Sequence, residues 1–131
     1  MKIAALKRFN LYRDGGSVSA SFLGDDGKEY CLFFGIVRRQ TARRAAGYAA
    51  PVLKSFTPSE YRSPVTGDVS PTWIKDAQSL TWEEARGILA AVSWHLAGLD
   101  SRERRIYEEM VAAAAEDGRS IATSAGHRTG V

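Results

Sequence analysis

The first third of the chain alternates apolar and polar residues with a period of two. Val18, Ala20 and Phe22 alternate with serines, and residues 3–11 show the same alternation with one exception. Because successive side chains of a strand point to opposite faces, this period predicts half-buried strands. Residues 29–37 are apolar at both parities, which suits a central strand. Together these stretches predict a three-stranded antiparallel meander.

Turn residues separate these strands, and a less regular region follows them. Asp14-Gly15-Gly16 and residues 24–27 carry the glycines and aspartates that tight turns favour. Residues 41–50 are predicted to form a short alanine-rich helix, capped by Thr41 and stopped by Pro51. Residues 51–56 are expected to form a fourth strand or an extended segment. Residues 57–80 hold three prolines and are predicted to be a long connection with at most one helical turn.

The last third has the period of a helix. Thr81 and Glu84 form a predicted capping box, and Gly98 is expected to end the helix that follows. A second helix is expected from Asp100 to a stop at Asp117-Gly118. The predicted core-facing residues of the first helix are Trp82, Ala85, Leu89, Val92, Leu96 and Leu99, and those of the second are Ile106, Tyr107, Met110, Val111, Ala113 and Ala114.

Strands early and helices late indicate an α+β fold. We expect a three- to four-stranded antiparallel meander sheet in the N-terminal part, packed by two C-terminal α-helices. Residues 1–118 are predicted to form one domain, because the sequence shows no internal repeat and no obvious domain boundary. Residues 119–131 are small and polar without periodicity, and are predicted to be a loosely held C-terminal tail.

The composition is that of a small globular protein. The chain has 131 residues, of which 44% are apolar and 25% charged, enough for one core without metals or disulfides. Cys31 is the only cysteine, so no internal disulfide can form. The first apolar run is too short for a signal peptide, and no run reaches the length of a membrane span. We therefore expect a soluble, cytoplasmic protein.

Charge is distributed unevenly along the chain. Residues 1–62 carry eleven Lys or Arg against five Asp or Glu, whereas residues 63–131 carry seven against ten. The densest basic cluster follows the central strand and consists of Arg38, Arg39, Arg43 and Arg44. The planar guanidinium suits two-pronged contacts with carboxylates and phosphates. The cluster predicts a contact with an acidic partner surface; the alternative is a solvated turn partly paired with the acidic half.

The residue types that carry catalysis are not clustered in the sequence. His95 and His127 lie far apart, and neither belongs to a metal-binding spacing, so we expect no metal and no cofactor. The paired carboxylates are sequence neighbours, which point about 100° apart on a helix. We therefore expect a non-enzymatic protein, with an active site built from distant residues as an open alternative.

One tryptophan falls outside the predicted core. Trp94 lies opposite the core-facing stripe of the first helix, with Gly87, Ala91 and Gly98 on the same face. Tryptophan is enriched in interface hot spots, and small neighbours allow close approach of another backbone. This face is a candidate partner or homodimer surface; alternatively, the C-terminal helix or the long connection covers Trp94.

A local resemblance bears on DNA binding. Leu11-Tyr12-Arg13-x-Gly15-Gly16 and Asp26-Gly27-Lys28-Glu29-Tyr30-x-Leu32 resemble the arm-binding domains at the N-termini of phage-type integrases. The resemblance covers about forty residues and implies a meander that reads DNA. The second half shows no recombinase residue set.

From these features we predict a non-enzymatic binding protein, a small inhibitor or accessory factor of bacterial or phage type. It would dock an acidic surface of a protein or nucleoprotein partner through the basic segment, with no membrane partner. The alternative is a direct DNA- or RNA-binding protein that uses the sheet and residues 38–44.

Overall fold

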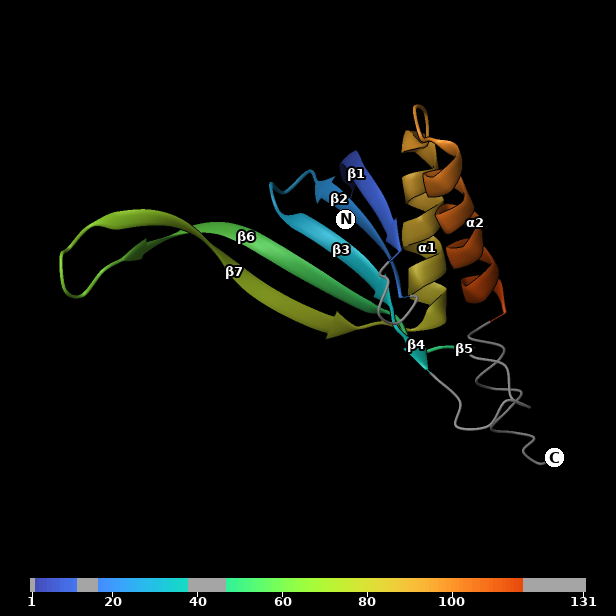
Figure 1. Cartoon of the computed structure of the whole chain (residues 1–131), viewed down its shortest axis with the longest axis horizontal. Coiled ribbons are helices and arrows are strands. Elements are labelled where there is room, and N and C mark those ends of the chain that lie inside the picture. Colours follow the sequence, from blue (N-terminus) through green and yellow to red (C-terminus); the bar gives the residue numbers. More distant parts are fainter. Residues whose placement is uncertain (1, 12–16, 38–46, 117–131) are drawn as a thin grey trace.

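A computed structural model describes residues 2–11, 17–37 and 47–116 as a sheet layer and a helix layer (Figure 1). The main sheet is antiparallel, with strand order β1-β2-β3-β6-β7, and β4 pairs with β5 in a small second sheet. The strands are β1 (Ile3–Leu11), β2 (Val18–Gly24), β3 (Glu29–Phe34), β4 (Ile36–Val37), β5 (Gly47–Tyr48), β6 (Val52–Arg62) and β7 (Val69–Ser79). The helices are α1 (Trp82–Val92), the short 3₁₀ helix η1 (Ser93–His95) and α2 (Ser101–Ala115).

The core lies between the helices and one side of the sheet. Ala20 of β2 pairs with Leu32 of β3, which pairs with Leu53 of β6, and all three are buried. Paired residues point to the same side of a sheet, so this row marks the side that the helices cover, here called the helix side. Ile106 and Met110 of α2 are buried against it. The side turned away from the helices is called the far side.

Side-chain caps fix where both helices begin. Thr81 accepts a hydrogen bond from the Glu84 N–H, and Glu84 accepts one from the Thr81 N–H, which completes the predicted capping box. Asp100 accepts from the Glu103 N–H at the start of α2. These bonds satisfy amide groups that the first turn of a helix leaves without partners.

The predicted fold class is confirmed, and the sheet is larger than expected. Residues 57–80, predicted to be a long connection, instead form the outer half of β6 and all of β7. The main sheet therefore has five strands, against the three or four expected. The sequence interpretation was wrong because Pro58 and Pro71 were taken as strand breakers, and both lie within paired strands.

Three local predictions also need correction. The helix predicted over residues 41–50 lies mostly outside the described residues, and its end is wrong because Gly47–Tyr48 forms β5. The α-helix α1 ends at Val92, and Gly98 lies in the following turn at φ 90°. Val111, expected in the core, is exposed. The tail predicted at residues 119–131 lies outside the described residues.

Candidate functional site

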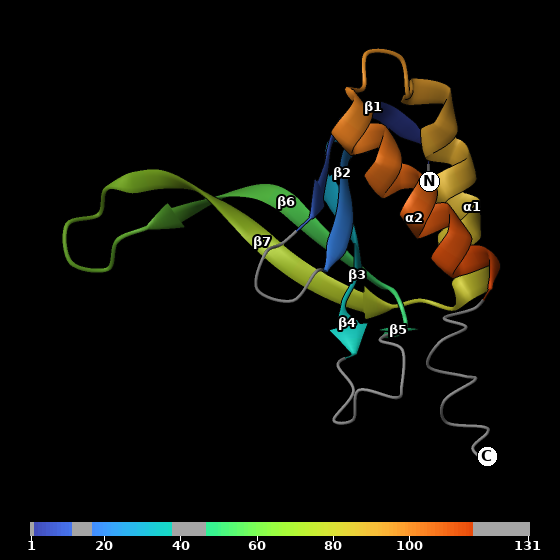
Figure 2. The same ribbon diagram turned by 45° about the vertical axis from the view of Figure 1, so that its right-hand side comes forward.

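The outer halves of β6 and β7 leave the sheet as a two-stranded hairpin. β3 pairs with β6 only from Val52 to Phe56, whereas β7 pairs with β6 along its whole length. Within the described part of the chain, residues 57–74 therefore have no third strand beside them, and we call them the arm. Figures 1 and 2 show the arm extending away from the helices and the rest of the sheet.

Exposed apolar side chains are concentrated on the arm. Among the described residues, eight large hydrophobic side chains are exposed, and five of them belong to the arm. Their exposed fractions are 54% for Tyr61, 90% for Val65, 44% for Val69, 48% for Trp73 and 59% for Ile74. Scattered exposed hydrophobics are ordinary, but a concentration of them on one projecting element is typical of interaction sites.

The arm offers these side chains on both of its faces. Trp73 pairs with Pro58 on the far side, and Val69 and Pro71 lie on the same side along β7. Tyr61 and Ile74 lie on the helix side, beyond the reach of the helices. The arm carries one arginine, Arg62, against Glu60 and Asp68. The arm is thus close to neutral.

Hydrogen bonds order the tip of the arm. The Ser63 N–H donates to the Asp68 carbonyl at 2.8 Å, and the Arg62 guanidinium donates to the Gly67 carbonyl at 2.7 Å. The Ser63 hydroxyl accepts from the N–H groups of Val65 and Thr66. Gly67 has φ 79°, a value that other residues rarely adopt. The tip therefore presents Val65 on a defined turn.

The edges of the arm are partly blocked against further strand pairing. The bonds Ser63 N–H to Asp68 and Leu80 N–H to Pro51 set the alternation of the β6–β7 ladder. By this alternation, the backbone groups of Pro58 and Pro71 point outward, away from the partner strand. Proline lacks an N–H, so each strand of the arm is missing one outward donor. The prolines cost the hairpin no internal bond, and each interrupts the outward row of its strand at one position.

The far side of the sheet combines aromatic rings with cations. The Lys54 ammonium lies 4.8 Å from the centroid of the Phe33 ring. Lys75 pairs with Phe56, and Trp73 lies on the same side of β7, two residues before Lys75. A cation over an aromatic ring is stabilised by the ring quadrupole. This side of β3, β6 and β7 therefore has both stacking surface and positive charge.

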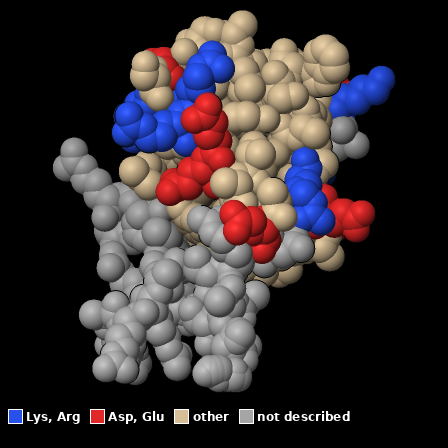
Figure 3. Space-filling view, turned by 90° about the vertical axis from the view of Figure 1, so that its right-hand side faces the viewer, with Lys and Arg blue, Asp and Glu red and all other residues tan. Residues whose placement is uncertain are grey.

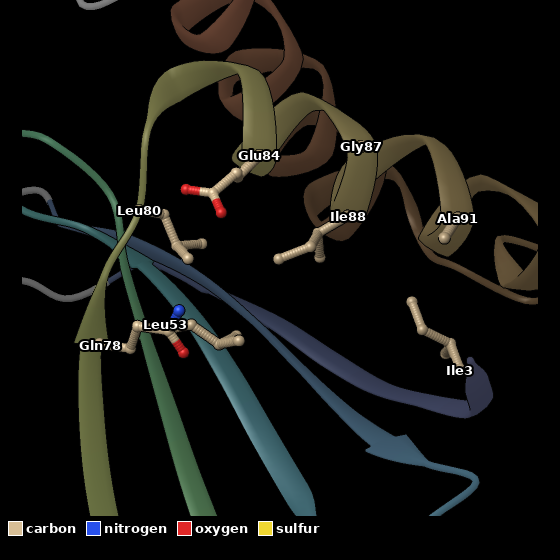
Figure 4. A pocket seen from close by; sticks show the side chains of 8 residues that line it. All are labelled: Ile3, Leu53, Gln78, Leu80, Glu84, Gly87, Ile88 and Ala91. Carbon is tan, nitrogen blue, oxygen red and sulfur yellow. The ribbon is translucent and has the colours of Figure 1, made fainter. Parts of the chain in front are cut away.

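A groove of about 380 Å³ opens between α1 and the helix side of the sheet (Figure 4). Its walls are mainly aliphatic, and the polar groups are a carboxylate and an amide at one end. The carboxylate of Glu84 is already engaged by the Thr81 N–H. The lining residues are Ile3, Leu53, Gln78, Leu80, Glu84, Gly87, Ile88 and Ala91.

A second groove, of about 360 Å³, lies between α1 and α2. Leu89, Tyr107 and Val111 are among its lining residues, and Arg86 donates to the Ala114 carbonyl beside it at 2.6 Å. Figure 3 shows the helix side of the molecule, where basic and acidic side chains lie next to one another around uncharged surface. The described residues on this face therefore carry charges of both signs.

Shifted pKa values occur at a structural turn. The Tyr30 hydroxyl donates to the Asp26 carboxylate, which raises the pKa of Tyr30 to about 12 and lowers that of Asp26. Asp26 lies in the turn between β2 and β3, and Tyr30 lies on β3. Among the described residues, no three His, Cys, Asp or Glu side chains gather in a way that could hold a metal ion. Nor is any described helix long and apolar enough to span a membrane.

The structure places the predicted site residues in different regions. Arg38, Arg39, Arg43 and Arg44 lie outside the described residues. Trp94 lies on η1 with 88% of its surface exposed, so neither α2 nor the β6–β7 hairpin covers it.

The small residues predicted to share a face with Trp94 separate from it. Gly87 and Ala91 line the groove between α1 and the sheet, and Gly98 lies in the turn before α2. His95 is half-buried on η1.

Sequence reasoning missed the arm. The available signal was the alternation in residues 69–79, where Val69, Pro71, Trp73 and Ala77 share one parity. Two such runs separated by a turn that contains Gly67 predict a hairpin. The prolines concealed it.

Comparison with known proteins supplies no relative. No family model, no curated protein and no solved structure matches the chain.

Proposed function

We propose that the chain is a non-enzymatic binding protein, an inhibitor or accessory factor, that docks a protein or nucleoprotein partner through the arm. The observation that supports this proposal is the concentration of exposed apolar side chains on a projecting, ordered hairpin. The arm contributes little to the core, because its side chains lie beyond the helices. Its composition is explained by contact with another molecule.

Energetic considerations support this assignment. A two-stranded hairpin is marginally stable in water unless packing or a further strand supports it. The arm nevertheless exposes Tyr61 and Trp73, two residue types that supply much of the binding energy in interfaces. Burial of such a side chain stabilises a complex by roughly 1.5–3 kcal/mol. Docking in an apolar groove of a partner would both cover these rings and support the hairpin.

The basic segment supplies the charge that the arm lacks. Arg38, Arg39, Arg43 and Arg44 follow β4 directly in sequence and would contact acidic groups of the same partner. Charges at the rim of an interface mainly increase the association rate, and salt reduces this increase. An apolar contact at the centre of the interface mainly sets the dissociation rate. The two surfaces thus have separable kinetic signatures.

Two tryptophan variants test the proposal. Trp73 and Trp94 are both exposed, one on the arm and one on η1, so Trp73→Ser and Trp94→Ser form a matched pair. Each variant and the wild type serve as bait in extract of the source cell. A partner retained by wild type and Trp94→Ser but lost with Trp73→Ser supports arm docking. Loss with Trp94→Ser alone would move the interface to η1, and equal retention by all three would refute both assignments.

Direct nucleic-acid binding is a second candidate, favoured by the far side of the sheet. On that side Lys54 lies over the Phe33 ring, Lys75 pairs with Phe56, and Arg8 adds a cation on β1. Aromatic rings stack on unpaired bases, and cations contact phosphates.

Fluorescence anisotropy with single-stranded and duplex oligonucleotides tests this candidate. Affinity should fall steeply with salt, and alanine at Arg38, Arg39, Arg43 and Arg44 should reduce the salt slope. The candidate is rejected if neither oligonucleotide binds at low salt.

A further inference from the structure

We infer that β7 pairs edge to edge with β7 of a second copy of the chain, giving a two-fold dimer with one continuous sheet. This inference goes beyond the proposed function, because it concerns the backbone edge of β7 rather than the tip and faces of the arm. The two edges of the sheet differ in a way that supports it.

The β1 edge is protected against pairing. Its ladder with β2 is irregular at two places, between Ile3 and Ala5 and between Leu6 and Arg8. Such irregularities twist an edge and interrupt its hydrogen-bonding row. In addition, the Phe9 N–H is occupied by the Glu103 carboxylate of α2 at 3.4 Å. A further strand would meet a broken row of donors at β1.

The β7 edge is long and regular. Its pairing with β6 runs without a register shift from Val69 to Ser79. By the alternation of this ladder, the odd-numbered residues of β7 turn their backbone groups outward. Of these, only Pro71 lacks an N–H. Residues 73, 75, 77 and 79 form an uninterrupted row of outward donors and acceptors.

The chemistry of β7 is self-complementary in the register that pairs the whole strand. That register has its two-fold axis at Ile74, which faces Ile74 of the second copy on the helix side. Trp73 then lies opposite Lys75 of the second copy, and Thr72 opposite Asp76 of the second copy. An indole faces an ammonium and a hydroxyl faces a carboxylate, both favourable cross-strand pairs.

Registers with the two-fold axis one or two residues later in β7 are disfavoured, because they bring like charges together. An axis at Lys75 would oppose two lysines, and an axis at Asp76 would oppose two aspartates. The axis at Ile74 opposes no like charges along β7. Its one defect is Pro71, which leaves a carbonyl of Ala77 of the second copy without a donor.

The β7–β7 pairing would also cover side chains that are exposed on both faces of the single chain. On the far side, Lys75 pairs within its own chain with Phe56, so in the dimer it lies between Phe56 and Trp73 of the second copy. On the helix side, the two Ile74 side chains, each 59% exposed in the single chain, cover each other. The inner part of each arm gains the third and fourth strands that it lacks.

Disulfide trapping tests the register. In a Cys31→Ser background, Ile74→Cys places its thiol opposite its own copy at a non-hydrogen-bonded pair, where the Cβ atoms approach to about 4.5–5.5 Å. We expect mild oxidation to give a covalent dimer. Ser70→Cys is the matched control on the same side of β7. Its two copies would lie eight residues, or roughly 27 Å, apart and should not link.

Each outcome of the trapping experiment either supports or overturns the β7–β7 pairing. A dimer from Ile74→Cys but not from Ser70→Cys supports the register. Equal linking by both variants indicates random collision and overturns it. Linking by Trp94→Cys without Ile74→Cys would instead place a dimer interface on η1.

Sedimentation equilibrium of the untrapped protein completes the test. The wild type should dimerise, and Lys75→Gln should weaken the dimer about tenfold, because both symmetry-related cation–ring contacts are lost. Lys54→Gln, on the same side but on β6, should leave the dimer unchanged. A wild type that stays monomeric at every concentration overturns the inference while leaving partner capture by the arm unaffected.

Discussion

Tyr30 and Asp26 show how one hydrogen bond links a turn to the core. Tyr30 stacks on Phe22 at a centroid distance of 5.5 Å, and its hydroxyl reaches Asp26 in the turn that follows β2. Gly24 lies so close that a Cβ there would meet both residues at 2.7 Å. Glycine is required at this position for space.

This hydrogen bond predicts a loss of stability at high pH. The pKa of Tyr30 rises from 10.0 to about 12 on folding, chiefly because its hydroxyl donates to Asp26. The hydrogen bond therefore contributes fully to the free energy of unfolding below about pH 10, and this contribution is lost as the pH rises towards 12. Denaturant unfolding between pH 8 and 12 should show this loss in the wild type and a smaller one in Tyr30→Phe. Parallel curves would contradict the pairing.

The same hydrogen bond also predicts a loss of stability at low pH. The pKa of Asp26 lies below its usual 3.8, mainly because of Tyr30 and then because of the Lys28 N–H. A lowered carboxyl pKa gives stability that is present at neutral pH and is lost as pH falls through the folded-state value. Tyr30→Phe should therefore also lose less stability than the wild type in acid.

Trp94 is predicted to be unimportant for folding. With 88% of its surface exposed, its side chain buries little area in the single chain. Trp94→Ala should change the free energy of unfolding by no more than about 0.5 kcal/mol, as is usual for exposed positions. Thermal unfolding measures the change. A loss of several kcal/mol would mean that another part of the chain covers the ring.

At the scale of elements, the sequence predicted those parts in which pattern and capping agree. The capping box at Thr81, the Asp100 cap and the meander of β1 to β3 were foreseen, because local chemistry specifies them. The β6–β7 hairpin was not foreseen, because its prolines were taken as strand breakers. A proline whose backbone points outward costs a strand no hydrogen bond to its partner. That orientation depends on the register, which the sequence does not display.

The capping box gives a prediction for α1. Thr81→Ala removes the acceptor for the Glu84 N–H and leaves an amide of the first turn without its partner. The expected cost is about 1 kcal/mol in the free energy of unfolding. Denaturant titration of the variant measures it. Thr81→Ser keeps an acceptor and should recover most of the loss.

At the scale of the whole molecule, the candidate site could be predicted only in part. Helical spacing placed Trp94 outside the core-facing stripe, because neighbouring turns fix the direction of a helical residue, but it left open whether another part of the chain covers the ring. The arm could not be found in this way. Its exposure depends on where β3 ends relative to β6, a long-range fact of pairing.

An arm-shortened chain tests whether the arm is a docking element outside the core. Replacement of residues 58–73 by Asn-Gly joins Thr57 to Ile74, a hydrogen-bonded pair that a two-residue turn can close. We predict a cooperative unfolding transition with a midpoint within a few degrees of the wild type, and loss of the partner that the full chain captures. A shortened chain that fails to fold, or that captures the same partner, would contradict the claim that the arm is a docking element outside the core.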